Sequence, residues 1–268
     1  MRKIKTNKKL GQHFLIDQHI IDHIIKYFRP KKCQNIIEIG PGLGALTLPL
    51  LRYMNHIYAI EFDYHLIKYL QKKYEKIRKK VTFVSKDVMT VNFLKFYNEK
   101  NKNIRILGNL PYNISTSLIL HLSSHIDIIN DMLFMLQKEV VNRLISVPNS
   151  KTYGSLSIIT QYFFNILPIL EVNPISFQPT PKVDSVLTHF IPYKNNPYQV
   201  NNIQLFKKII KTAFNQRRKK ISNSLNIFFS KKDFKKLKIS SYFRAENLSI
   251  KDYCNLACLL HLKHANKK

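Results

Sequence analysis

One short stretch, Gly108-Asn109-Leu110-Pro111-Tyr112-Asn113, combines an amide, a proline and an aromatic ring in consecutive positions. It follows an apolar run, Ile104 to Leu107, that we expect to form a buried strand, and Ser115 then opens a helical pattern. Open α/β sheets bind ligands just outside the carboxyl ends of their strands. Proline biases the residue before it away from the helical region, so the Leu110 carbonyl can face a ligand. The trio suits a flat heterocycle with an exocyclic amine; an ordinary turn with a buried tyrosine is the alternative.

A second candidate is the glycine-rich turn Gly40-Pro41-Gly42-Leu43-Gly44, which follows an apolar run that carries Glu38. A helix that starts after such a turn offers unpaired N–H groups to a ligand. The turn fits both a dinucleotide fingerprint and the methyl-donor motif of Rossmann-like methyltransferases. Glu61 follows at the spacing from which an acid binds ribose hydroxyls in either case. The turn by itself therefore leaves the two ligands open, and a turn without a ligand is the lesser alternative.

Asp87 favours the methyl donor. It follows the predicted third strand, Val81 to Val84, where an acid can accept a hydrogen bond from the adenine amine of S-adenosylmethionine (SAM). A solvent-facing aspartate at the end of a strand is an equally common explanation.

The elements that would position these residues alternate between strands and helices. Such alternation predicts a parallel, doubly wound sheet of the Rossmann-like α/β class. We expect two further strands at residues 165–172 and 185–191, paired as an antiparallel edge. The other expected strands are residues 35–39, 56–60, 81–84, 104–107 and 132–136, and the expected helices are 17–28, 45–53, 63–74 and 137–147, with another after Ser115.

The pattern changes after residue 194. The rest of the chain is helical in period over residues 202–214, 218–229 and 248–262, contains no glycine, and carries more than twice the net positive charge per residue of the first 194. We therefore expect two domains. Residues 1–194 would form the methyltransferase domain, with a basic, loosely held arm at 1–16, and residues 195–268 a small, basic, all-helical domain that contacts RNA.

The formal net charge is +28, with 44 basic against 16 acidic residues, and it favours a polyanionic partner. We expect a nucleic acid rather than a membrane, because no apolar run is long enough to cross one and the chain has no tryptophan. No secretory signal is apparent, so the expected location is the cytoplasm. Cys254, Cys258 and His261 could share a helix face, but ligands from one helix rarely enclose zinc, so no metal site is expected.

These motifs occur in the order found in the adenine dimethyltransferases of ribosomal RNA, and the chain resembles that family, above all its bacterial small-subunit (kasugamycin-sensitivity) type. The resemblance covers nearly the whole chain. Further matching segments are Leu10-Gly11-Gln12-His13-Phe14-Leu15, Leu136-Gln137-Lys138-Glu139-Val140, Tyr153-Gly154-Ser155-Leu156-Ser157, Pro179-Thr180-Pro181-Lys182-Val183-Asp184-Ser185 and Ala213-Phe214-Asn215-Gln216-Arg217-Arg218-Lys219-Lys220.

The resemblance implies dimethylation of two adjacent adenosines near the 3′ end of small-subunit ribosomal RNA, late in assembly of the 30S subunit. We expect a monomer that acts on an assembly intermediate, with SAM as methyl donor. His13 stands where the bacterial enzyme has asparagine, and both side chains can donate or accept a hydrogen bond. Together with the glycine-rich turn, the resemblance implies donor contacts at His13, Leu15, Gly40, Gly42, Glu61, Asp87 and Asn109.

The mechanism expected for an adenine amine needs positioning rather than a strong base. The Asn109 side chain and the Leu110 carbonyl would accept hydrogen bonds from the amine and localise its lone pair. Tyr112 would stack on the base once it has left its own stack. Pro111 completes the set of catalytic residues, and Arg217, Arg218, Lys219 and Lys220 are the expected RNA-phosphate contacts.

Three other interpretations remain at this point. A large-subunit RNA adenine methyltransferase shares the core motifs, although the segment from Phe214 to Lys220 disfavours it. The chain could instead act chiefly as an RNA-binding assembly factor. A nicotinamide enzyme is the weakest choice, because it leaves the stretch from Asn109 to Tyr112 and the positive charge unexplained.

Overall fold

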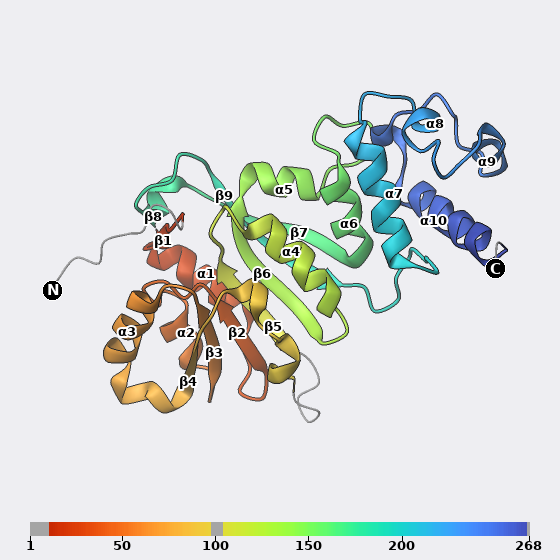
Figure 1. Ribbon diagram of the computed structural model, residues 1–268. Helices are drawn as coiled ribbons and strands as arrows, with labels where there is room; N and C mark the ends of the chain where they lie inside the picture. Colours follow the sequence, from red (N-terminus) through yellow and green to blue (C-terminus); the bar gives the residue numbers. More distant parts are fainter. Residues whose placement is uncertain (1–10, 98–103, 267–268) are drawn as a thin grey trace. The chain divides into compact units, whose positions relative to one another are not determined.

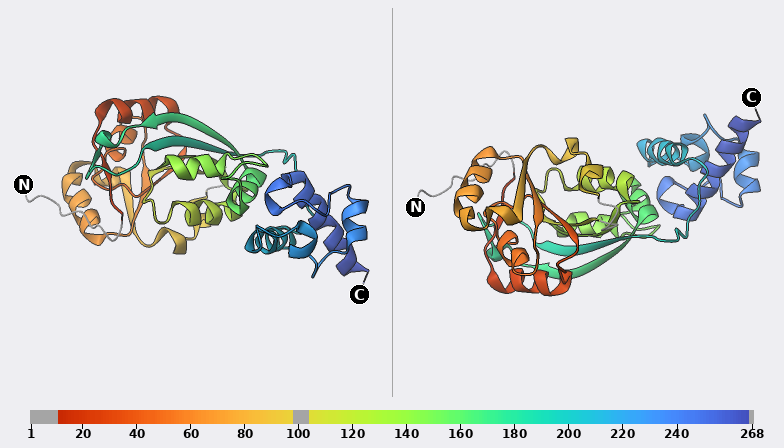
Figure 2. Two further views of the ribbon diagram at one scale, coloured as in Figure 1. Left: turned by 90° about the horizontal axis from the view of Figure 1, so that it is seen from above. Right: turned by 90° about the horizontal axis from the view of Figure 1, so that it is seen from below.

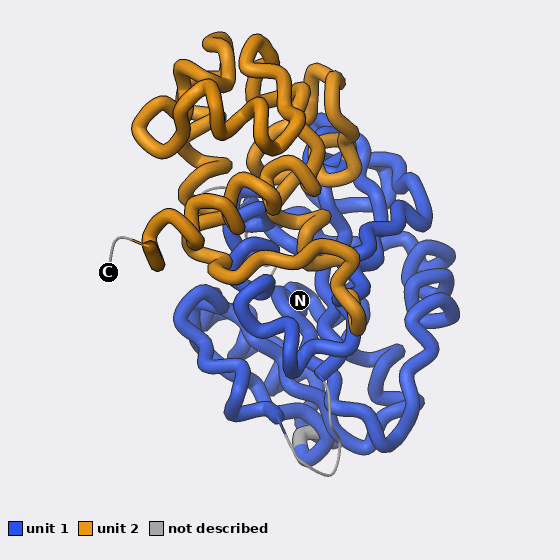
Figure 3. The backbone as a smooth tube through the Cα atoms, turned by 90° about the vertical axis from the view of Figure 1, so that its right-hand side faces the viewer, with its two compact units in different colours: residues 1–141, 165–192 blue, residues 142–164, 193–268 orange. Residues whose placement is uncertain are grey.

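The computed structural model describes residues 11–97 and 104–266 (Figure 1). Residues 1–10 of the expected basic arm lie outside the described residues, as do 98–103 and 267–268. The chain divides into two compact units (Figure 3). Unit 1 comprises residues 1–141 and 165–192, and unit 2 comprises residues 142–164 and 193–268.

Unit 1 is built on a seven-stranded sheet with the order β4-β3-β2-β5-β6-β9-β7. The first five strands are parallel, β9 runs antiparallel to β6, and β7 is hydrogen-bonded to β9 at the edge. This confirms the predicted Rossmann-like class and the pairing of the last two strands. The bounds are β2 Asn35–Ile39, β3 Ile57–Glu61, β4 Val81–Ser85, β5 Ile104–Asn109, β6 Ile129–Gln137, β7 Phe164–Val172 and β9 Ser185–Pro192.

Helices cover both faces of this sheet; Figure 2 shows α1 on one side and α4 on the other. Helix α1 is capped as expected by Asp17, whose side chain accepts hydrogen bonds from two backbone N–H groups of the first turn. Its apolar stripe, including Ile24 and Phe28, is buried in a core shared with Leu50 of α2 and with Leu107. The bounds are α1 Gln18–Phe28, α2 Thr47–Leu51, α3 Tyr64–Lys73, α4 Ser115–Leu122 and α5 Lys138–Leu144, with short helices η2 Glu75–Lys80, η3 Val88–Thr90, η4 Phe93–Phe96, η5 Ser123–His125 and η6 Pro174–Ser176.

A second, two-stranded sheet corrects the expectation of a loosely held arm for its described end, residues 11–16. Phe14–Leu15 forms β1, which pairs antiparallel with β8, Phe177–Gln178. Both residues of β1 are buried. A strand this short has no periodicity to read, and its partner lies far along the sequence, so only the fold reveals it.

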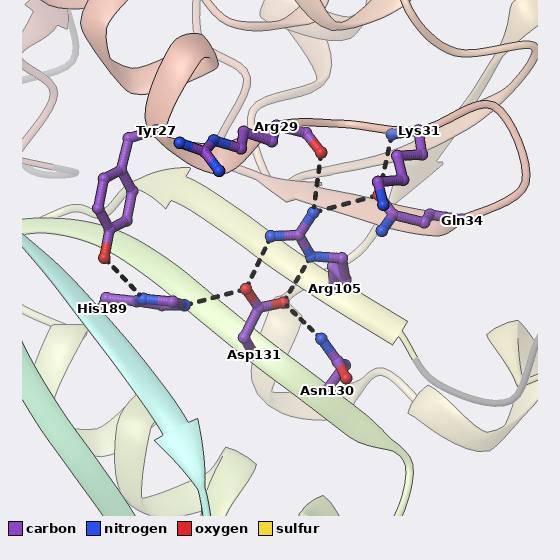
Figure 4. A network of polar contacts seen from close by, with 8 residues as sticks. All are labelled: Tyr27, Arg29, Lys31, Gln34, Arg105, Asn130, Asp131 and His189. Carbon is purple, nitrogen blue, oxygen red and sulfur yellow. Dashed lines mark hydrogen bonds and ion pairs between the residues drawn. The ribbon is translucent and has the colours of Figure 1, made fainter.

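A buried ionic network ties α1 to the middle of the sheet, as Figure 4 shows. Arg105 on β5 forms a bidentate ion pair with Asp131 on β6, at 2.6 and 2.8 Å. His189 on β9 contacts the same carboxylate at 2.9 Å, and the Tyr27 hydroxyl on α1 lies 3.0 Å from the other ring nitrogen of His189. Burial acts to raise the pKa of Asp131, but the hydrogen bonds from Arg105 and His189 lower it to about 2.

Unit 2 is helical, as expected, but its limits differ from the predicted domain of residues 195–268. Residues 142–164 belong to it because α6 packs against α7 and α10. The single helix expected over 218–229 is only the short α8, since residues 216–218 form a turn before it and residues 225–228 form another after it. Helices α6 and α9 were not expected. The bounds are α6 Ser155–Phe163, α7 Ile203–Asn215, α8 Ile221–Ser224, α9 Lys231–Lys236, η7 Ala245–Asn247 and α10 Ile250–Ala265.

Within the described ranges, no helix combines the length and the apolar composition that a membrane span requires. Those ranges also contain no group of three or more His, Cys, Asp or Glu side chains arranged to hold a metal ion. Cys254 is buried in α10, and burial raises the pKa of its thiol to about 12. It is a core residue.

Candidate active site

A cavity of about 220 Å³ lies at the carboxyl ends of the parallel strands of unit 1. It is lined by the residues that end or directly follow β2, β3, β4 and β5, together with residues 11–15 from the start of the described chain. This is the edge at which open α/β sheets bind ligands. The cavity brings together all the residues predicted as cofactor or catalytic contacts: His13, Leu15, Gly40, Gly42, Glu61, Asp87, Asn109, Leu110, Pro111 and Tyr112.

Two glycines of the site are required by neighbours within the protein. Gly42 has φ +56°, and a Cβ there would lie 2.9 Å from the ring of Phe14 in β1. Gly108 lies inside β5, where a Cβ would collide with the carbonyl group of Ile39 at the end of β2. Gly42 thus makes room for Phe14 of β1, and Gly108 lets β5 approach the end of β2 directly before Asn109.

Glu61 ends β3 and is only 8% exposed. One of its carboxylate oxygens accepts a hydrogen bond from the backbone N–H of Asp63 at 3.0 Å, and the other from that of Gly42 at 3.4 Å. Burial raises the pKa of this carboxyl group. The two backbone bonds fix its orientation, and each oxygen keeps a further lone pair for a ligand.

Glu38 lies deeper in the site, 1% exposed, and accepts a hydrogen bond of 2.7 Å from the Thr47 hydroxyl. Burial raises its pKa to about 7, and the neighbouring Glu61 adds to the rise. Glu38 therefore ties the end of β2, directly before the glycine-rich turn, to α2. Asp87, by contrast, is exposed at the end of β4, where one of its oxygens accepts a 2.9 Å hydrogen bond from the N–H of Met89.

The amide of Asn109 has a defined orientation. Its Nδ2 donates a 2.6 Å hydrogen bond to the backbone carbonyl of His13. A carbonyl oxygen can only accept, so the nitrogen must face His13, and the Oδ1 oxygen is presented as an acceptor on the opposite side of the amide. The segment from β1 thus orients a predicted catalytic group.

Tyr112 is held at both ends of its side chain. Its hydroxyl lies 2.8 Å from the hydroxyl of Ser185 at the start of β9, and its ring is stacked on that of His13 with centroids 5.4 Å apart. The His13 ring donates from Nδ1 to the carbonyl of Pro179 at 2.6 Å. Burial raises the pKa of Tyr112, which keeps the phenol neutral at physiological pH.

Several cavity residues were not predicted. Phe62 and Val88 directly follow the two acids at the ends of β3 and β4, and they supply apolar surface beside each carboxylate. An apolar residue after an acid at a strand end is the signal that could have found them. Pro179 and Ser185 lie outside the cavity lining and belong to a segment that resembles the family. Their contacts with His13 and Tyr112 were not predicted, because those partners lie far away in the sequence.

The four predicted RNA contacts lie in unit 2, in the turn that follows α7, and all four are exposed. Arg217 forms an ion pair of 2.6 Å with Glu246 and donates to the carbonyl of Lys151 at 2.8 Å. The ammonium group of Lys220 lies 4.4 Å from the centroid of the Tyr242 ring. Arg218 and Lys219 have no ion-pair partner among residues 11–97 and 104–266.

The mixed sheet and the cavity at its carboxyl edge define the Rossmann-like fold of SAM-dependent methyltransferases. Residues 3–261 match the model of the family described as ribosomal RNA adenine dimethylase. The chain belongs to that family.

Curated relatives agree with this assignment. A ribosomal RNA small subunit methyltransferase A of Photorhabdus laumondii is 47% identical over 252 residues, which cover 94% of this chain and 92% of the relative. The protein of the same name from Yersinia pestis is 45% identical over 263 residues, 98% of this chain and 96% of its own length.

Solved structures show the same fold. A dimethyladenosine transferase from Plasmodium falciparum matches with a TM-score of 0.80 and 25% identity, covering 94% of this chain and 98% of that one. A 23S rRNA methyltransferase, ErmE, matches with a TM-score of 0.68 at 20% identity, over 92% and 99% of the two chains. The second likeness concerns the fold alone.

Proposed function

We propose that this protein transfers methyl groups from SAM to the exocyclic amines of two adjacent adenosines near the 3′ end of small-subunit ribosomal RNA. The observation that carries the proposal is the oriented acceptor of Asn109, which lines the same cavity as the glycine-rich turn, Glu61 and Asp87. The names of the relatives from Photorhabdus laumondii and Yersinia pestis support the small subunit as the source of the substrate.

The residues around the glycine-rich turn fit the donor. SAM supplies, when bound, a methyl group on a positively charged sulfur. Glu61 is oriented by its two backbone partners to accept hydrogen bonds from ribose hydroxyls. Asp87, oriented by the N–H of Met89, can accept from an adenine amine, and Phe62 and Val88 provide apolar walls for the ring. The backbone of Gly40 and Gly42 lets the donor approach closely.

Two acceptors serve the target amine. The Asn109 Oδ1 and the Leu110 carbonyl can each take one N–H of the adenine amine, which draws its lone pair out of conjugation with the ring. After the first transfer the methylated amine would lose one proton to water, so that one N–H remains. A single acceptor is enough to orient this N–H for transfer from a second SAM molecule. The Tyr112 ring, fixed by Ser185 and His13, provides the stacking surface.

RNA binding completes the proposal. The exposed basic turn from Arg217 to Lys220 would hold phosphates, which positions the enzyme on RNA without reading its sequence. We propose that the enzyme acts as a monomer in the cytoplasm, on a 30S assembly intermediate whose 3′-terminal adenosines are still accessible.

One experiment tests the proposal directly. The purified protein is incubated with labelled SAM and small subunits that lack adenine methylation, and the modified bases are mapped. We expect label on two neighbouring adenines near the 3′ end of the RNA, with two methyl groups on each. No label in the small-subunit RNA, or label only at bases other than these two adenines, would contradict the proposal.

A further inference from the structure

Unit 2 exposes two adjacent aromatic side chains beside its basic turn. Tyr242 is 73% exposed and Phe243 is 46% exposed, in the segment between α9 and α10 (Figure 1). Single exposed apolar residues are ordinary on protein surfaces, but neighbouring rings next to a cluster of cations are a combination used for binding. The pair plays no part in the donor or amine chemistry described above.

Backbone hydrogen bonds hold the segment that carries the two rings next to the basic turn. The N–H groups of Ile221 and Ser222, at the start of α8, donate to the carbonyls of Phe243 and Ser241. The Lys220 ammonium group lies over the Tyr242 ring, 4.4 Å from its centroid. The aromatic pair and the turn are therefore parts of one surface, and their spacing does not depend on flexible side chains alone.

The charge of this surface is almost wholly positive. The nearby carboxylate of Glu246 forms an ion pair with Arg217 at 2.6 Å. The same guanidinium group donates a hydrogen bond to the carbonyl of Lys151. Arg217 thus anchors the turn and neutralises the carboxylate. Arg218, Lys219 and Lys220 are left exposed next to the rings.

We propose that Tyr242 and Phe243, together with Arg218, Lys219 and Lys220, form a binding surface for unpaired nucleotides of RNA. Bases stack on the two rings, and the cations contact the adjoining phosphates. The proposal rests on the proposed RNA substrate and deepens it. Duplex RNA would use the cations alone, because its bases are already stacked on one another. The surface therefore selects a single-stranded segment of the RNA.

The test compares a Tyr242→Ala/Phe243→Ala variant with the wild-type protein. The probes are a single-stranded RNA oligonucleotide and an RNA duplex of equal length, titrated over a series of salt concentrations. For the single strand we expect affinity to fall by about tenfold or more, because each stacked base contributes substantially. The slope of affinity against salt should stay unchanged, because no charge is removed. Duplex binding should be nearly unaffected.

Three further variants sharpen the comparison. Tyr242→Phe keeps a ring and should bind single strands like wild type, whereas Tyr242→Leu/Phe243→Leu keeps apolar bulk without a ring and should bind weakly. Tyr64→Ala is the matched control, since Tyr64 on α3 is 56% exposed and has the Lys68 ammonium group 4.6 Å from its ring centroid. It should change nothing. Unaltered SAM affinity in all variants shows that unit 1 is folded, and retained duplex binding through the basic turn shows the same of unit 2.

Wild-type affinity of the Ala/Ala variant for single strands, or an equal loss for both probes, would overturn the proposal. Full affinity of the Leu/Leu variant would also overturn it and indicate an apolar contact, such as a protein partner. Methyl transfer by the wild-type protein is assayed in parallel. If methyl transfer to small subunits occurs while the rings are not needed for single-strand binding, the proposed binding surface is contradicted and the proposed function is not. If the rings matter but no transfer occurs, the proposed function fails.

Discussion

Asn109 can serve as an acceptor because its amide nitrogen is already engaged with the carbonyl of His13. This hydrogen bond fixes which of the two amide atoms, Nδ2 or Oδ1, faces the cavity. An asparagine without such a bond would adopt one orientation only on binding its ligand. The cost of orienting the group is therefore met during folding rather than during catalysis. Tyr112, held by Ser185 and His13, follows the same principle.

Replacing Asn109 tests this at the level of one atom. We expect Asn109→Ala to lower the rate constant of methyl transfer by about a hundredfold, the usual effect of removing one oriented polar group at a reacting centre. Asn109→Asp keeps an oxygen toward the cavity but places a carboxylate against the His13 carbonyl, so it should retain only part of the activity. Single-turnover rates with small subunits measure both.

The affinities of the Asn109→Ala variant for RNA and for SAM serve as controls and should change far less than the rate. Unchanged turnover would remove Asn109 from the mechanism. Turnover that falls only in parallel with SAM affinity would assign it to donor binding.

Among the elements, β5 carries two residues with different roles. Gly108 allows the close approach to β2 beside the site, and Arg105 forms the ion pair with Asp131 that links β5 to β6. Gly108 and Arg105 lie at opposite ends of this strand, Ile104–Asn109. The sequence is informative about such elements when their residues report on local geometry. Asp17 and Asp63 predicted the starts of α1 and α3 as N-cap residues, and apolar runs predicted the strands. The pairing of β1 with β8 had no local signature, since two residues define no period.

The close approach of β5 to β2 predicts the effect of Gly108→Ala. The added methyl group would meet the Ile39 carbonyl, which belongs to the backbone and cannot rotate away. We expect a loss of about 1–3 kcal/mol in the free energy of unfolding. Gly154→Ala is the control, because a Cβ there meets nothing within 4 Å and should cost less than about 1 kcal/mol. Denaturant titration measures the free energy of unfolding of both variants. Equal losses of this free energy in the two would contradict the packing argument.

The ionic network of Arg105, Asp131 and His189 predicts a pH dependence of stability. The folded-state pKa of Asp131 is about 2, below the ordinary 3.8, so the unfolded chain takes up the proton first as the pH falls. The stabilisation is therefore complete above pH 3.8 and is lost as the pH falls through 2. It amounts to about 2 kcal/mol at most.

Asp131→Asn should lack this component. At neutral pH it should be less stable than wild type by about 3 kcal/mol, because Arg105 loses its carboxylate. The gap between the two proteins should narrow between pH 4 and pH 2 in denaturant titrations. A gap that stays constant down to pH 2 would show that the aspartate gains nothing from its partners.

At the scale of the whole molecule, the excess of positive charge is the property that composition reports most directly, and its use is concentrated in exposed segments. We expect that replacing Arg217, Arg218, Lys219 and Lys220 by glutamine weakens RNA binding and flattens the dependence of log affinity on log salt by about 3 to 4 units. The measurement is a salt titration with small-subunit RNA.

A matched control removes the same charge elsewhere. Lys68, Lys72, Lys76 and Lys79, on α3 and η2, are equally exposed, and their replacement by glutamine should alter the salt dependence much less. Equal effects of the two sets would mean that only net charge matters, and an unaltered slope for the first set would remove it from the RNA contact.

The division into units was only partly predictable. Composition and period locate the change at residue 194, close to the observed passage at 192–193. They do not reveal that residues 142–164 belong with the C-terminal helices, because α6 has buried side chains like those of any helix against a sheet. Its partners, α7 and α10, are specified only by the fold.

The pairing of β1 with β8 has a consequence for biosynthesis. The carbonyl that orients Asn109 belongs to His13, and His13 is itself held by Pro179, 166 residues further along. A nascent chain that ends before β8 contains all five parallel strands, yet it lacks the strand with which β1 pairs. Residues 13–15 are thus translated early but are held in place only when residues 177–179 are present. Methyl transfer must therefore await the emergence of residues 177–185 from the ribosome that makes the enzyme.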